Sequence, residues 1–188
     1  MADPYPRQAA RTRNFNLGLP RAFRIADDGS RVAFVRTRSG DDTVAGLWVL
    51  DVAEGAEREV FHPSSTDERV TREELDRRER AREPQSGVTS YEADPGLRQA
   101  ALSQGRSVRL ADLETGATRE VATAGPAFDA RIDPTSTRIA YATGGDLRVH
   151  DLHTGDGSLL AGDPDPDVRW GIAEFIAAEE MERLRGYW

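Results

Sequence analysis

The chain has 188 residues, a formal net charge of −8 and 31% charged residues, and it contains neither cysteine nor lysine. The length suits one domain. The missing residue types exclude a disulfide scaffold, a thiolate metal site and lysine-based catalysis. Net acidity argues against nucleic acid as a partner. The apolar stretches are too short to cross a bilayer, and the N-terminus lacks the apolar segment of a secretory signal. We therefore expect a cytoplasmic protein with no membrane partner.

Residues 1–14 contain no apolar core segment, and we expect them to form a disordered N-terminal arm ahead of a domain that spans residues 15–188. Within that domain three segments share one plan: residues 25–60, 89–121 and 128–160. Each reads as an Asp-Gly or Asp-Pro turn, a strand with alternating apolar residues, a turn with glycine, and a second strand. The repetition predicts a mainly β fold built from similar antiparallel units.

One aspartate follows the second strand of each unit, where its carboxylate can cap the next turn. These residues are Asp51, Asp112 and Asp151. The second and third lie 39 residues apart, close to the period of a four-stranded propeller blade. The first and second lie 61 residues apart, and a charged insertion at residues 65–84 accounts for the difference.

This insertion is strongly helical in type and rich in arginine. Thr71 followed by Glu74 has the spacing of a capping box. Its apolar residues are few: Val70, Leu75 and Ala81. A helix with so thin an apolar face gains little from burial, so composition favours a mobile, solvated spacer over part of a site unless a partner docks on it.

After the third unit a Pro/Asp-rich turn leads to a predicted helix over residues 171–186, closed by Gly186. Its predicted apolar face consists of Ile172, Phe175, Ile176 and Ala177. Glu179 and Glu180 are adjacent, so on a helix they stand about 100° apart and could both reach one small cation. The alternative is a solvated acidic patch.

The sequence thus predicts a partial β-propeller of about three blades, each a four-stranded antiparallel sheet, with a charged helical insertion and a C-terminal double-Glu helix. Complete propellers have ~4–8 blades. The aromatic pair Tyr187-Trp188 at the last two positions would leave a large apolar area exposed. We therefore expect the sequence to be truncated and to continue beyond this point.

Two motifs resemble the dipeptidyl peptidase IV family of serine peptidases, and most closely its cytosolic branch, dipeptidyl peptidases 8 and 9. The segment EFIAAEEMERLRGYW, residues 174–188, is similar to the double-glutamate segment of that family. The segment TREELDRRERAREPQSGVTSYE, residues 71–92, is similar to the Arg-rich helix and following strand of the cytosolic branch. The motifs occur in the family's order, and the resemblance covers roughly residues 15–188.

The resemblance implies a serine exopeptidase that releases N-terminal X-Pro or X-Ala dipeptides from a peptide with a free N-terminus. It implies that Glu179 and Glu180 hold the substrate α-ammonium and that Arg82 contacts a substrate carbonyl. The neighbouring Arg77, Arg78 and Arg80 leave the register of that last contact open. The resemblance also allows a homodimer of the full-length enzyme.

No G-x-S-x-G nucleophile elbow occurs in the sequence, and the three histidines lie in loops or at a strand end. We therefore assign no catalytic residue, no metal and no cofactor, and we expect the partner α/β-hydrolase domain, absent here, to lie in the same full-length chain. The chain alone should be inactive. Two functions follow: the N-terminal substrate-gating part of such an exopeptidase, or a non-enzymatic propeller-type module that binds peptides or proteins.

Overall fold

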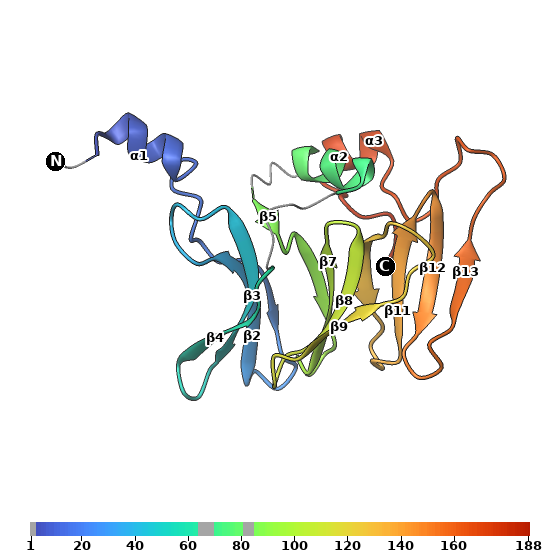
Figure 1. Ribbon diagram of the computed structural model, residues 1–188, viewed down its shortest axis with the longest axis horizontal. Helices are drawn as coiled ribbons and strands as arrows, with labels where there is room; N and C mark the ends of the chain where they lie inside the picture. Colours follow the sequence, from blue (N-terminus) through green and yellow to red (C-terminus); the bar gives the residue numbers. More distant parts are fainter. Residues whose placement is uncertain (1–2, 64–69, 81–84) are drawn as a thin grey trace.

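Three antiparallel sheets follow one another along the chain and stand side by side (Figure 1). The structure is a computed structural model that describes residues 3–63, 70–80 and 85–188. Each sheet pairs its four strands in sequence order, which is the arrangement of a propeller blade. The predicted partial propeller with three four-stranded blades is confirmed.

The strands match the three units predicted from the sequence, except that β1 begins before the first unit, at Arg21. Sheet 1 contains β1 (Arg21–Ile25), β2 (Arg31–Thr37), β3 (Val44–Asp51) and β4 (Ala56–Phe61), with the short β5 (Ser86–Gly87) parallel to β3. Sheet 2 contains β6 (Ser90–Ala93), β7 (Gln99–Gln104), β8 (Ser107–Asp112) and β9 (Thr118–Val121). Sheet 3 contains β10 (Phe128–Ile132), β11 (Arg138–Thr143), β12 (Asp146–Asp151) and β13 (Gly157–Ala161).

The core lies between the sheets, because strand residues alternate between the two faces. In β7, Ala100 and Leu102 belong to the apolar cluster shared with sheet 1, whereas Ala101 belongs to the cluster shared with sheet 3. All three side chains are fully buried. The middle sheet is therefore covered on both faces, and it holds sheets 1 and 3 in place.

The three aspartates expected to cap turns do so, and each is the last residue of the third strand of its sheet. Asp112 Oδ1 accepts hydrogen bonds from the backbone N–H groups of Glu114 and Thr115, at 2.9 and 2.7 Å. Asp51 and Asp151 accept equivalent bonds. Each blade thus closes the hairpin between its third and fourth strands with a local side-chain contact that the sequence alone specifies.

Helices α2 (Arg72–Arg80) and α3 (Phe175–Glu180) lie side by side over one end of the sheets (Figure 1). Helix α1 (Tyr5–Arg11) stands apart from the sheets and buries no side chain. It occupies part of the predicted disordered arm, and the structure differs there because Pro6 at the start of the helix is preset for helical backbone. None of the helices in the described ranges is long and apolar enough to span a bilayer.

The C-terminal helix is shorter than the predicted residues 171–186. It ends at Glu180, and Glu182 then takes a left-handed backbone with φ of +54°, which no helix continues. The predicted apolar face is also wrong in part: Phe175 and Ile176 are 61% and 57% exposed. The helix buries the small side chains of Ala177 and Ala178 instead.

Candidate functional site

The paired carboxylates lie at the C-terminal end of α3, on its exposed side. Glu174 starts the helix: its side chain accepts hydrogen bonds from the backbone N–H groups of Ile176 and Ala177, at 2.9 and 3.1 Å. These bonds hold the pKa of Glu174 below its ordinary value. With Ala177 buried beneath the helix, Glu179 and Glu180 are both exposed and accessible to a ligand.

Glu179 already contacts a cation from the neighbouring helix. Its Oε1 lies 3.6 Å from Nε of Arg80 in α2. The Arg80 guanidinium also lies 5.2 Å from the ring centroid of Phe175, within the range of a cation–π contact. Arg80, Phe175 and Glu179 line a cavity of about 410 Å³ together with two carboxylates of α2, Asp76 and Glu79. Carboxylates, a guanidinium and an aromatic ring thus line one cavity between the two helices.

Arg82, the third predicted site residue, lies outside the described residues. The nearest described arginine of the same run, Arg80, faces α3. The structure therefore brings the Arg-rich helix and Glu179 together.

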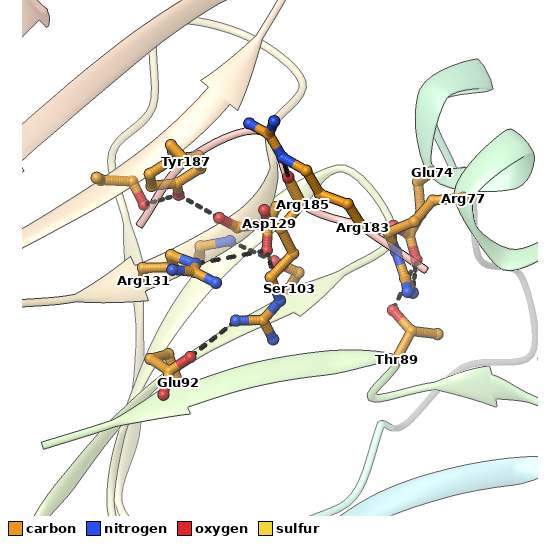
Figure 2. Close-up of polar contacts among 12 residues, drawn as sticks. Glu74, Arg77, Thr89, Glu92, Ser103, Asp129, Arg131, Arg183, Arg185 and Tyr187 are labelled. Atoms are coloured by element: carbon orange, nitrogen blue, oxygen red, sulfur yellow. Dashed lines mark hydrogen bonds and ion pairs between the residues drawn. The ribbon is translucent and has the colours of Figure 1, made fainter. Parts of the chain in front are cut away.

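The middle of α2 is fixed by a buried carboxylate rather than by apolar contacts. Glu74 is 1% exposed, and its carboxylate accepts hydrogen bonds from Thr89 at 2.7 Å and from Arg77 at 2.8 Å (Figure 2). It accepts a further hydrogen bond from Arg78 at 2.8 Å. Burial alone raises the pKa of Glu74, but the hydrogen bonds and charges of the two arginines outweigh burial and lower the pKa below its ordinary value. Helix α2 is anchored through this carboxylate.

The predicted capping box at the start of α2 forms only in part. Thr71 Oγ1 accepts the Glu74 backbone N–H at 3.1 Å, as expected of an N-cap residue. The Glu74 side chain does not complete the box in the usual way, because its carboxylate points inward to Thr89 and the arginines. The thin apolar face led us to expect a solvated spacer, whereas the structure connects α2 to the interior through the Glu74 carboxylate.

A polar cluster joins the C-terminal segment to the inner strands of the sheets, which are the first strand of each: β1, β6 and β10. Figure 2 shows its part on β6 and β10. Glu92 of β6 accepts two hydrogen bonds from Arg24 of β1, at 2.9 and 3.2 Å. It also accepts one from Arg185 at 2.8 Å. Burial raises the pKa of Glu92, but hydrogen bonds from the two arginines give a net shift below the ordinary value. Glu92 is therefore ionised and shared by two guanidiniums.

Asp129 of β10 is the second carboxylate of this cluster and has the opposite shift. Its Oδ1 lies 3.7 Å from Arg185 Nε and 4.0 Å from Arg131 Nε, longer than good hydrogen bonds. Burial raises the pKa of Asp129, and the charges of the two arginines offset this only in part. Asp129 also has a left-handed backbone, with φ of +49°, which Asp tolerates better than most residues.

Tyr187 connects this cluster to sheet 3. Its hydroxyl lies within hydrogen-bond distance of the carbonyl oxygens of Asp129 and, at 3.0 Å, Ala140. Burial raises the pKa of Tyr187 above its usual value, so the hydroxyl stays protonated and can donate. A second tyrosine, Tyr91, donates in the same way to the Ala22 carbonyl in β1, at 2.7 Å. Ala22 and Asp129 both have positive φ next to a register shift in their strands.

Sequence reasoning missed Glu74, Glu92, Asp129 and Arg185. For Glu74 a signal existed: arginines three and four residues later share its helix face and can bind one carboxylate. For the other three no local signal existed, because Arg185 and its carboxylates lie far apart in the sequence. Among the described residues no group of three metal-ligating side chains comes together.

A sequence model of one family, described as the dipeptidyl peptidase IV (DPP IV) N-terminal region, matches residues 93–188. The matched part includes Glu179 and Glu180 and makes up just over half of the chain.

Solved structures show a similar fold at low sequence identity. The chain is 17% identical to the β-propeller domain of Cps50 (Swd1) from Myceliophteria thermophila, with a TM-score of 0.52. It is 13% identical to TolB from Acinetobacter baumannii and 18% identical to the tricorn protease, each with a TM-score of 0.51.

These alignments cover 80%, 78% and 77% of this chain, but only 41%, 33% and 13% of the Cps50, TolB and tricorn chains. The chain thus spans less than half the length of each. At these identities the likeness shows the β-propeller fold alone, whereas the family follows from the matched sequence model: the chain belongs to the family of the dipeptidyl peptidase IV N-terminal region.

Proposed function

We propose that this chain is the N-terminal, substrate-gating part of a serine exopeptidase that releases X-Pro or X-Ala dipeptides. In this proposal Glu179 and Glu180 anchor the α-ammonium of a peptide with a free N-terminus. The observation that carries it is the pair of exposed carboxylates on α3, one of which lines a cavity and already contacts the Arg80 guanidinium at 3.6 Å.

The chemistry of the pair suits an ammonium group. An ammonium has three N–H donors and no acceptor, so two adjacent carboxylates can accept its protons in charge-assisted hydrogen bonds. An internal peptide unit has no such charge and cannot use the site. The carboxylates would therefore select the chain end, and the adjacent Arg-rich helix would supply the contact to a substrate carbonyl, for which Arg82 remains the proposed residue.

The bond-breaking residues belong, in this proposal, to an α/β-hydrolase domain of the same full-length chain. The family assignment supports that partner, and the resemblance to the cytosolic branch supports a cytoplasmic location and a homodimeric full-length enzyme. The 188-residue chain by itself is proposed to bind but not to cleave.

Calorimetric titration with alanyl-proline amide and its N-acetylated form tests the proposal. The free amine should bind, and the acetylated form should bind at least tenfold more weakly, since a charge-assisted hydrogen bond contributes roughly 1.5–3 kcal/mol. Glu179→Gln and Glu180→Gln should each lose about tenfold in affinity for the free amine. In a full-length enzyme, alanine at either position should abolish cleavage.

Glu182→Gln is the matched control, because Glu182 is an exposed glutamate of the same segment that does not belong to the pair. Equal affinity for the free and acetylated peptides would reject the ammonium anchor. That result would favour the alternative function, a non-enzymatic propeller-type module that binds peptides or proteins.

A further inference from the structure

The segment that carries the paired glutamates is a loop whose two ends touch. It leaves sheet 3 and begins at Gly171, and it returns at Gly186. A Cβ atom added to Gly186 would overlap the backbone of Gly171 and Ile172, so the two ends pack with no room for a side chain. Helix α3 lies between these ends, and its position depends on how they are held.

Helix α3 has little core of its own. It is six residues long and buries only Ala177 and Ala178. Phe175 and Ile176 are exposed, as is Met181 just after the helix. Burial of two alanines contributes little free energy. Apart from Arg80 of α2, which contacts Glu179 and Phe175, contacts outside the helix must therefore fix the place of the two glutamates.

Arg185 supplies such a contact at the returning end of the loop. Its Nη1 donates to Glu92 Oε2 of β6 at 2.8 Å, and its Nε lies 3.7 Å from Asp129 Oδ1 of β10. One guanidinium thus connects the loop to sheets 2 and 3 at once (Figure 2). Arg24 binds the same Glu92 from β1, so sheet 1 is joined through the shared carboxylate.

The planar guanidinium is suited to this task. It presents donors in fixed directions and can face two carboxylates, whereas an ammonium is a single point charge. Tyr187, two residues later, also attaches this segment to sheet 3, because its hydroxyl donates hydrogen bonds to the carbonyl oxygens of Asp129 and Ala140. Gly186, between them, allows the close contact with Gly171 and Ile172.

We infer that Arg185 is a positioning residue for the Glu179–Glu180 pair: it fixes the returning end of the loop to the inner strands of sheets 2 and 3, and thereby sets where the carboxylates stand. The inference rests on the proposed function for its effect on peptide binding. Its structural part, the ordering of α3 by Arg185, is measurable without any peptide.

Two readouts on Arg185→Gln test the inference in the intact 188-residue chain. The first is hydrogen exchange at the Ala178 and Met181 amides, which donate to Glu174 and Ala177 within α3. We expect their protection to fall at least tenfold while the β7 amide of Leu102 keeps its protection. The second is the affinity ratio between free and N-acetylated alanyl-proline amide, which should fall at least fivefold.

Arg119→Gln is the matched control. Arg119 is an exposed arginine of β9, the last strand of sheet 2, and lies outside the loop that carries the paired glutamates. It should leave both readouts within twofold of the wild-type values. A purely structural loss of folded protein would reduce all protections and the active fraction together, but it would not change the affinity ratio of the molecules that remain folded.

Arg185→Lys covers the case in which the glutamine variant does not fold. Lysine keeps the charge but cannot present the same planar donors, so it should lose protection in α3 by an intermediate factor of about three. Wild-type α3 protection in every folded Arg185 variant would overturn the inference. If wild-type protein binds neither peptide, the proposed function fails, and the exchange readout still decides whether Arg185 orders α3.

Discussion

The two helices of the candidate site lie side by side, yet they are held in different ways. Helix α2 places its own carboxylate, Glu74, in the interior, where it binds Thr89 and two arginines. Helix α3 buries no charged side chain, and its loop is fixed at the ends. The difference shows how one glutamate can anchor a helix while two others remain exposed to a ligand.

The largest expected effect is the loss of stability when Glu74, the buried carboxylate of α2, is replaced. Glu74→Gln removes the charge that faces Arg77 and Arg78, whose side chains are each only 12% exposed. Breaking a buried ion pair from one side typically costs about 3–5 kcal/mol, and we expect about 3 kcal/mol here. Urea denaturation followed by circular dichroism measures the loss.

Glu79→Gln is the control for this variant, because Glu79 lies on the same helix and is exposed. It should change the free energy of unfolding by less than about 0.5 kcal/mol. Equal losses for the two variants would contradict the anchoring role of Glu74.

A smaller effect is expected where the α3 loop closes. Gly186→Ala places a methyl group against the backbone of Gly171 and Ile172, and overpacking of this kind costs typically about 1–3 kcal/mol. In contrast to Glu74→Gln, it should lower the hydrogen-exchange protection of the α3 amides and leave that of the α2 amides unchanged.

Gly157→Ala serves for comparison. A Cβ at Gly157 of β13 would meet no atom closer than 3.9 Å, so its cost should stay below about 1 kcal/mol. A Gly186→Ala protein with wild-type exchange in α3 would show that the close contact is not needed.

The smallest expected effect is the pH dependence of the free energy of unfolding, to which Asp129 and Glu74 should contribute in opposite directions. Asp129 has a raised pKa in the folded protein, so its proton favours folding: this contribution is present below pH ~3.9 and is lost as pH rises through the folded pKa. Glu74 has a lowered pKa, so its contribution is present above pH ~4.3 and is lost as pH falls through the folded pKa.

Asp129→Asn keeps the side-chain volume and tolerates the left-handed backbone, so it should change the free energy of unfolding by less than about 1 kcal/mol at pH 7. In urea denaturation between pH 3 and pH 7, the free energy of unfolding of the wild type should increase relative to that of Asp129→Asn as pH falls. Relative to that of Glu74→Gln, it should decrease below pH ~4.3. Parallel trends for both variants would contradict the opposite pKa shifts.

Most of the fold was predictable because its signals are local. Alternating apolar residues, glycine turns and the capping aspartates define each blade within about 35 residues, and Asp51, Asp112 and Asp151 cap their turns as expected. The C-terminal helix was harder to predict. Its apolar residues suggested sixteen residues of helix, but Glu182 turns the backbone left-handed and Phe175 stays exposed.

The candidate site was predictable only in part. The two sequence motifs, separated by two blades, gave the Arg-rich helix and the glutamate pair, and Arg80 does meet Glu179. The residues that support the site gave no comparable signal. Arg185, Glu92 and Asp129 are ordinary charged residues in sequence, and their pairing depends on how the inner strands converge.

The sequence by itself determined the blades, their turns and the presence of a charged helix and a double-Glu segment, because each depends on contacts between residues close in the chain. Only the tertiary structure decided which charges lie inside. Glu74 and Asp129 are buried and Glu179 and Glu180 are exposed, although all four are acidic residues in charged surroundings. The arginine partners of Glu74 lie on its own helix, but Thr89, which also binds Glu74, and Arg185, which faces Asp129, reach these carboxylates only when the elements pack together.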